Sequence, residues 1–68
     1  MSEVIFIVED SHEGGYTAKS LEHSIFTEGE TLDELKENVK DAIKCHFDSE
    51  EMPHIVRLHI VRDEVIAI

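Results

Sequence analysis

The sequence has little that would crosslink or anchor the chain. It contains one cysteine, one proline and no tryptophan in 68 residues. A single cysteine excludes an internal disulfide, and the longest apolar run, residues 4–8, is far shorter than the roughly 20 residues of a membrane span. No basic segment precedes this run, so it is not typical of a signal peptide. These absences predict a cytoplasmic protein.

Positive charge is also scarce. The chain has 6 Lys and Arg residues against 16 Asp and Glu residues, a formal net charge of -10. Coulomb repulsion opposes direct binding to a phosphate backbone, so we expect no direct contact with nucleic acid. The length predicts a single domain over residues 1–68. A chain this short buries only about 60% of the surface of its unfolded form, which makes self-association a plausible source of stability.

The segments before residue 30 have the composition of strands. Residues 3–9 are rich in β-branched side chains, and residues 16–21 and 24–27 alternate apolar with polar side chains. The glycine pair Gly14 and Gly15 follows a polar stretch and can adopt the positive φ angles of a tight turn. The pattern predicts an antiparallel meander of three strands that ends at Glu28-Gly29-Glu30.

A helix is predicted from Leu32. Thr31 and Glu34 fit a capping box, in which Thr31 accepts a hydrogen bond from the Glu34 amide and Glu34 reaches back to the amide of Thr31. The apolar residues that follow are spaced three or four apart and form one stripe. The stripe consists of Leu32, Leu35, Val39, Ala42, Ile43 and Phe47.

The last part of the sequence predicts a polar loop and more strand. Residues 48–53 are polar and end at Pro53, residues 55–61 alternate, and residues 64–68 look like a second short strand or a continuation of the first. The predicted fold is an α+β fold with two layers, in the order β-β-β-α-β. It has one antiparallel-rich sheet, one helix and possible extra strand at residues 64–68.

One helix of about 15 residues covers only one face of such a sheet. Of the alternating apolar sets Val4/Phe6/Val8 and Ile5/Ile7, one is expected under the helix and the other outside. Ile55, Val61 and alternate residues of 65–68 would join the outside set. An apolar patch of this kind predicts a homo-oligomer or the capture of another protein. In the alternative, the last residues fold over the open face and close a monomer.

The acidic loop that contains Glu9, Asp10, His12 and Glu13 follows a strand, a position where divalent-metal sites are often built. A metal-dependent nuclease remnant would use Glu9, Asp10 and Glu28. The loop lacks the spacing of a known calcium site, and its acidity matches that of the whole chain. We therefore interpret it as a solvated turn.

Other reactive residues also lack a recognisable pattern. His54 and His59 are five residues apart and fall on opposite faces of a strand, as do Arg57 and Arg62. Cys45 lies beside the helix stripe and is expected to be a small, partly buried hydrophobic side chain. Together with the missing phosphate-loop and hydrolase motifs, this predicts no catalytic, cofactor-binding or metal-ligating residue and no cofactor.

The order of the motifs resembles the HicB-like antitoxin family, over about residues 4–47. The matching residues are Asp10, Glu13-Gly14-Gly15-Tyr16-Thr17-Ala18, Gly29-Glu30-Thr31-Leu32-Asp33-Glu34, Asn38 and Asp41-Ala42-Ile43. The resemblance implies a truncated ribonuclease H-like fold. It assigns structural roles to Gly14, Gly15 and Tyr16 at the turn and second strand, to Gly29 and Thr31 at the helix start, and to Asn38 and Ala42 within the helix.

The resemblance also implies a function. HicB-like proteins bind a small, basic, RNA-cleaving toxin of the HicA type and cover its active site, and a net charge of -10 suits a cationic partner. No helix-turn-helix or ribbon-helix-helix domain follows, so DNA-bound autoregulation is not expected. The leading hypothesis is a non-enzymatic protein-binding module. The alternatives are a stand-alone structural homo-oligomer and the nuclease remnant.

Overall fold

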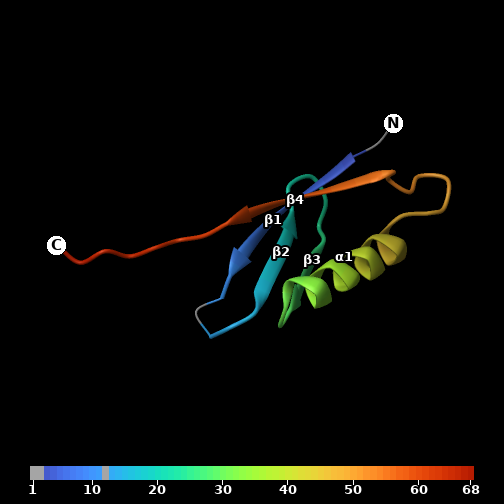
Figure 1. Ribbon diagram of the computed structural model, residues 1–68. Coiled ribbons are helices and arrows are strands. Elements are labelled where there is room, and N and C mark those ends of the chain that lie inside the picture. Colours follow the sequence, from blue (N-terminus) through green and yellow to red (C-terminus); the bar gives the residue numbers. More distant parts are fainter. Residues whose placement is uncertain (1–2, 12) are drawn as a thin grey trace.

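The computed structural model describes residues 3–11 and 13–68 of the chain. Within these residues the elements are β1 (Glu3–Asp10), β2 (Tyr16–Ser20), β3 (Phe26–Gly29), α1 (Leu32–His46) and β4 (Ile55–Val61), as Figure 1 shows. The predicted order β-β-β-α-β is confirmed. α1 has 15 residues, many of them charged, and is too short and too polar to cross a membrane. The described residues contain no other helix that could do so.

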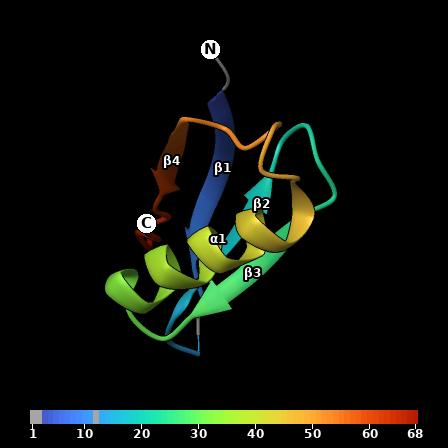
Figure 2. The same cartoon turned by 90° about the vertical axis from the view of Figure 1, so that its right-hand side faces the viewer.

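The strands form one mixed sheet in the order β3-β2-β1-β4. β1 pairs antiparallel with β2, and β2 pairs antiparallel with β3. β4 pairs with the other edge of β1 in parallel, because α1 carries the chain back across the sheet before β4 begins. The sheet is therefore antiparallel-rich, and α1 forms a second layer on one of its faces (Figure 2).

The turn between β1 and β2 depends on its two glycines. Gly14 and Gly15 have φ angles of 98° and 87°, which side chains with a Cβ rarely adopt. The turn is closed by hydrogen bonds from the Ser11 amide to the Gly15 carbonyl (3.0 Å) and from the Gly14 amide to the Ser11 carbonyl (3.1 Å). The predicted glycine turn is confirmed.

α1 begins where the sequence predicts. Thr31 is the N-cap, and its Oγ1 accepts a hydrogen bond from the Glu34 amide at 3.0 Å. Glu34 Oε1 accepts from the amide of Glu30 at 3.3 Å, one residue before the cap, so the second half of the predicted capping box is wrong. The cap at the other end is Phe47, whose amide donates to the Ile43 carbonyl at 3.0 Å.

The core lies between α1 and the inner face of the sheet. It consists of Val4, Phe6, Val8, Ala18, Ile25, Leu35, Val39 and Ile43, with Tyr16, Leu32, Ala42, Phe47, Met52 and Leu58 packed against it. The predicted helix stripe is thus confirmed as the face that meets the sheet. On β1, the set Val4/Phe6/Val8 is the one under the helix, while Ile5 and Ile7 are only partly buried.

Two sequence predictions about strands are corrected. β3 runs from Phe26 to Gly29 rather than over residues 24–27, because the Ser20 amide donates to the Ile25 carbonyl and closes the connection before the strand begins. Glu28 and Gly29 therefore pair with β2 instead of ending the meander.

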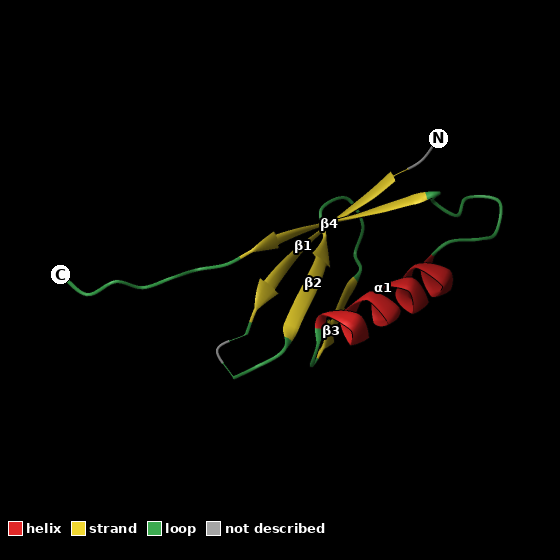
Figure 3. Cartoon of the chain, in the orientation of Figure 1, coloured by secondary structure: helices red, strands yellow, loops and turns green. Residues whose placement is uncertain are grey.

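Residues 64–68 form no strand. Residues 62–68 continue in an extended path beyond β4 (Figures 1 and 3). After Arg62, which contacts Asp10 of β1, the path leads away from the sheet and the helix. No strand of the described chain lies beside them, so their backbone groups have no ladder to join. They also do not fold over the open face of the sheet, which was the alternative that closes a monomer.

Candidate protein-binding surface

The face of the sheet turned away from α1, here called the outer face, carries no covering helix (Figure 2). Side chains alternate along each strand, so the strand register determines which residues share this face. They are Glu3, Ile5, Ile7 and Glu9 of β1, Thr17 and Lys19 of β2 with Leu21 next to it, Phe26 and Glu28 of β3, and Ile55, Arg57, His59 and Val61 of β4.

Large apolar side chains are exposed on the outer face. Leu21 and Phe26 are 61% and 62% exposed, and Ile55 and Val61 are exposed at the opposite edge. Ile5 and Ile7 lie between these two edges on the central strand. Ile5 and Ile7 are the apolar set of β1 that faces outward, a choice that the sequence left open. The expectation that Ile55 and Val61 join the outward set is confirmed. Exposed apolar side chains gathered on one face are typical of sites that bind proteins.

Charged side chains lie among the apolar ones as well as around them, since Lys19 lies between Phe26 and Ile7. Arg57 donates a hydrogen bond from Nε to Glu3 Oε2 at 2.6 Å across the parallel strands. This bond and the guanidinium charge hold the pKa of Glu3 below its ordinary value. The same bond and the negative charge of Glu3 raise the pKa of Arg57. At the other end of the outer face, Glu9 and Glu28 both lie opposite Thr17.

The acidic residues of the nuclease alternative do not converge. Glu9 and Glu28 are separated by the intervening strand β2, a distance of about 10 Å between their backbones. Asp10 lies on the other face of the sheet, where its Oδ2 is 3.5 Å from Arg62 Nε. In residues 3–11 and 13–68, no three His, Cys, Asp or Glu side chains are placed to hold a metal ion. His12 lies outside the described residues.

The histidines occupy separate places. His23 and His46 meet Phe47 in edge-to-face ring contacts, with centroids 4.9 Å and 4.8 Å from the phenyl ring. His59 lies on the outer face beside Ile7, while His54 precedes β4.

The expectation of a partly buried Cys45 is wrong. Cys45 is exposed. It lies on the flank of α1 nearest β3, which is an edge strand of only 4 residues, so no neighbouring strand extends far enough to cover the thiol.

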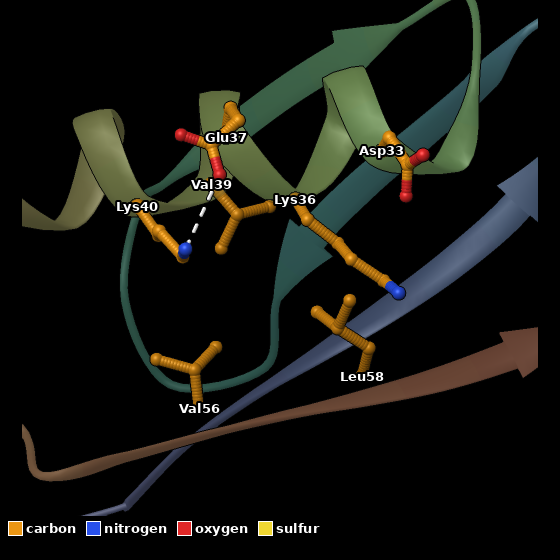
Figure 4. Close-up of a pocket in the computed structure, with 7 residues that line it drawn as sticks. All are labelled: Asp33, Lys36, Glu37, Val39, Lys40, Val56 and Leu58. Atoms are coloured by element: carbon orange, nitrogen blue, oxygen red, sulfur yellow. Dashed lines mark hydrogen bonds and ion pairs between the residues drawn. The ribbon is translucent and has the colours of Figure 1, made fainter.

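A second apolar feature lies between α1 and β4. The helix lies nearest to β2 and β3, so the inner side of β4 is covered only in part, at Leu58. The result is a groove of about 450 Å³ with Val39, Val56 and Leu58 along it (Figure 4). Its remaining lining residues, Asp33, Lys36, Glu37 and Lys40, come from α1.

Comparison with known proteins places the chain in a family. It is 48% identical over 66 residues to a UPF0150 protein of Thermotoga maritima, a match that covers 97% of this chain and 93% of the relative. The chain belongs to the UPF0150 family. The present chain is also 56% identical over 52 residues to a UPF0150 protein of Archaeoglobus fulgidus. That match covers 76% of the present chain and 77% of the relative. No family model matches the present chain, and no solved structure matches it significantly.

Sequence reasoning missed two parts of the surface of this UPF0150 protein. Leu21 and Phe26 were not assigned to the outer face, because their position depends on the pairing of Lys19 with Phe26. The odd spacing from Ala18 to Leu21 was the available signal, since it places the two residues on opposite faces. The groove beside β4 had no signal in the sequence, because it depends on where α1 crosses the sheet.

Proposed function

We propose that this UPF0150 protein is a non-enzymatic module that binds another protein through its outer face. The observation that carries the proposal is the exposure of Leu21 and Phe26 at one edge of that face and of Ile55 and Val61 at the other. These side chains offer apolar area that water exposure disfavours and that a partner can bury.

The chemistry of the partner follows from charge and from the HicB-like resemblance. The net charge of -10 favours a cationic partner, and Glu9 and Glu28 place two of the acidic groups on the outer face itself. We therefore propose a small, basic, RNA-cleaving toxin of the HicA type. Acidic groups would accelerate its association, and apolar contacts would set the lifetime of the complex.

Residues that carry the resemblance have structural roles of the kind it implies. The Asn38 side-chain amide donates a hydrogen bond from Nδ2 to the Glu28 carbonyl at 2.7 Å and ties α1 to β3. Gly15 lies so close to Gly29 that an added Cβ would be 2.9 Å from the Gly29 carbonyl oxygen. These contacts support the shared fold on which the proposed partner depends.

The test is a binding titration against a purified HicA-type toxin. Phe26→Ser removes a large apolar contact from the outer face and should weaken binding by about tenfold or more. The double substitution Glu9→Gln/Glu28→Gln should slow association. Its matched control, Glu37→Gln/Asp41→Asn on α1, makes the same change in net charge away from the outer face and should slow it less. Equal effects of the two double variants, or no effect of Phe26→Ser, would contradict the proposed surface.

The nuclease alternative has its own test. The protein is incubated with RNA or DNA while magnesium is titrated, and no hydrolysis is expected because Glu9, Asp10 and Glu28 are not brought together. Magnesium-dependent hydrolysis that disappears in Asp10→Asn would overturn the non-enzymatic assignment.

A further inference from the structure

Residues 62–68, here called the arm, leave the rest of the structure in an extended path. The arm continues the direction of β4, and the chain measures 52 Å along this axis but only 20 Å and 18 Å across it (Figure 1). Its apolar side chains meet solvent: Val65 is 93% exposed and Ile66 is 84% exposed. An isolated extended segment with this composition is a ready partner for another strand.

The free edge of β4, on the same chain, is a strand edge with which such an arm could pair. β4 is the last strand in the order β3-β2-β1-β4, so one of its edges has no strand beside it in the described sheet. β4 and the arm are each 7 residues long. The arm does not turn back onto its own β4, and residues 54–68 contain no glycine, proline or asparagine, residues that tight turns favour.

We propose that residues 58–68 of two copies of this chain pair antiparallel about a twofold axis at Asp63, which joins the two sheets through β4 and the arms. A twofold contact presents the same segment on both copies, so the segment must complement itself. This inference does not depend on the proposed toxin, since it uses the edge of β4 and leaves the outer face open.

The register follows from which side chains share a face. Arg62 lies on the inner side, because it contacts Asp10. Alternation then places Glu64, Ile66 and Ile68 on the inner side and the residues between them on the outer side. Residues opposite one another in an antiparallel pair share a face, so the axis passes through a residue and not between two.

An axis at Asp63 gives the best match of side chains. The opposed pairs are Leu58 with Ile68, Ile60 with Ile66, Arg62 with Glu64, and Val61 with Val65. An axis at Arg62 instead opposes two Arg62 side chains and sets Ile60 against Glu64. Opposed apolar pairs and opposite charges stabilise a ladder, and like charges destabilise it. The Asp63 register has one like-charge pair, Asp63 with itself, on the solvated outer side.

The same register covers the groove beside β4. Leu58 lines the groove, and Ile60, which is 54% exposed, continues the inner side of the same strand. Ile68 and Ile66 of the second copy would lie beside these two side chains. A second copy thus supplies the apolar cover that α1 does not provide.

Sedimentation velocity over a dilution series of the full chain tests the proposal. The unaltered chain should dimerise, and Ile66→Asp should raise the dissociation constant about a hundredfold or more, because each dimer buries two copies of the side chain. The control is Ala67→Asp, which adds the same charge on the outer side of the arm opposite His59 and should leave a dimer. A strict monomer, or a dimer that Ile66→Asp leaves intact, would overturn the proposal. Circular dichroism checks that each variant folds.

Engineered cysteines test the register. In a Cys45→Ser background, Val61→Cys/Val65→Cys places two thiols about 13 Å apart within one chain, too far for an internal disulfide. Oxidation should yield a covalent dimer with two disulfides, which mass spectrometry distinguishes from a single collisional crosslink. The comparison pair is Ile60→Cys/Glu64→Cys, whose thiols would be opposed, and so form paired disulfides, if the axis were at Arg62. Paired disulfides from the comparison pair alone would overturn the proposed register.

Discussion

At the scale of single residues, Gly29 shows that a glycine can be required by space and not by conformation. The Gly29 backbone has no positive φ angle, but an added Cβ would lie 2.6 Å from the backbone nitrogen of Leu35 at the start of α1. The Cα of Leu35 would be 2.8 Å away. Both Leu35 atoms belong to the backbone of α1, so neither moves easily. The close approach of β3 to α1 therefore depends on the absence of a side chain.

Gly29→Ala should accordingly destabilise the protein by about 1–3 kcal/mol, the usual cost of forcing extra atoms into a packed region. Thermal unfolding measures the change. Gly14→Ala is the comparison: no atom lies within 4 Å of its added Cβ, so its cost is only the roughly 1–2 kcal/mol of backbone strain at positive φ. A melting temperature unchanged by Gly29→Ala would mean that β3 and α1 are farther apart than described.

A pH prediction also belongs to this scale. The hydrogen bond from Arg57 lowers the pKa of Glu3 in the folded protein. A lowered folded-state pKa stabilises the fold above the unfolded-state pKa, and this contribution is lost as the pH falls through the folded-state value. Acidification below about pH 4.5 should thus cost the unaltered protein slightly more stability than it costs Glu3→Gln. Urea unfolding of both proteins at neutral and acidic pH measures the difference, and parallel curves would count against the ion pair.

At the scale of elements, α1 is attached to the sheet mainly by the stripe that the sequence predicts. Leu35, Val39 and Ile43 are its buried residues, and Leu35 is fully buried at the centre of the layer. Two hydrogen bonds add to this packing: the Thr31 cap fixes the start of the helix, and the bond from Asn38 to the Glu28 carbonyl fixes the position of the helix relative to β3.

Leu35→Ala should lower the free energy of unfolding by about 2–5 kcal/mol, because it removes buried methyl groups and leaves a cavity. That is a large share of the stability of so small a protein. Glu37→Ala, on the exposed side of the same helix, should change it by less than about 0.5 kcal/mol. Chemical denaturation of the two variants side by side would show equal effects if the helix were rotated from the described position.

The elements also show what sequence reasoning determines and what it does not. The boundaries of β4 and the start of α1 were predictable, because alternation over residues 55–61 and the Thr31 cap are local signals. The start of β3 was not, because the Ser20–Ile25 hydrogen bond reaches across a connection whose sequence is weakly patterned. Local signals also did not predict that Cys45 is exposed, because its exposure depends on the short edge strand β3 beside it.

The candidate protein-binding surface was predictable only in part, for a related reason. One helix on a four-strand sheet leaves one face open, so an outward apolar set that includes Ile55 and Val61 was predictable. Which set of β1 joins them was not, because only the position of α1 shows that Ile5 and Ile7 face outward. Phe26 and Leu21 depend on pairing between strands, and the groove at Val56 and Leu58 depends on the crossing of α1 over the sheet. Such long-range geometry is not encoded in a short window of sequence.

At the scale of the whole molecule, charge governs how the proposed partner arrives. A net charge of -10 on 68 residues produces a field that reaches beyond any single contact. Added salt should therefore slow association with a basic toxin by about tenfold or more between low and high ionic strength, while the dissociation rate changes much less. Stopped-flow mixing over a salt series measures both rates. An association rate that is independent of salt would argue against a cationic partner.

The parallel pairing of β1 with β4 has a consequence for folding during synthesis on the ribosome. The bonded residues Glu3 and Arg57 are 54 residues apart, and β1 is the central strand that both β2 and β4 must join. At about 5–20 residues per second, one edge of the nascent β1 waits roughly 3–10 s for β4 to be synthesised. During that interval its unpaired backbone is open to misassembly with other nascent chains, so translation speed and chaperone shielding should affect the yield of folded protein.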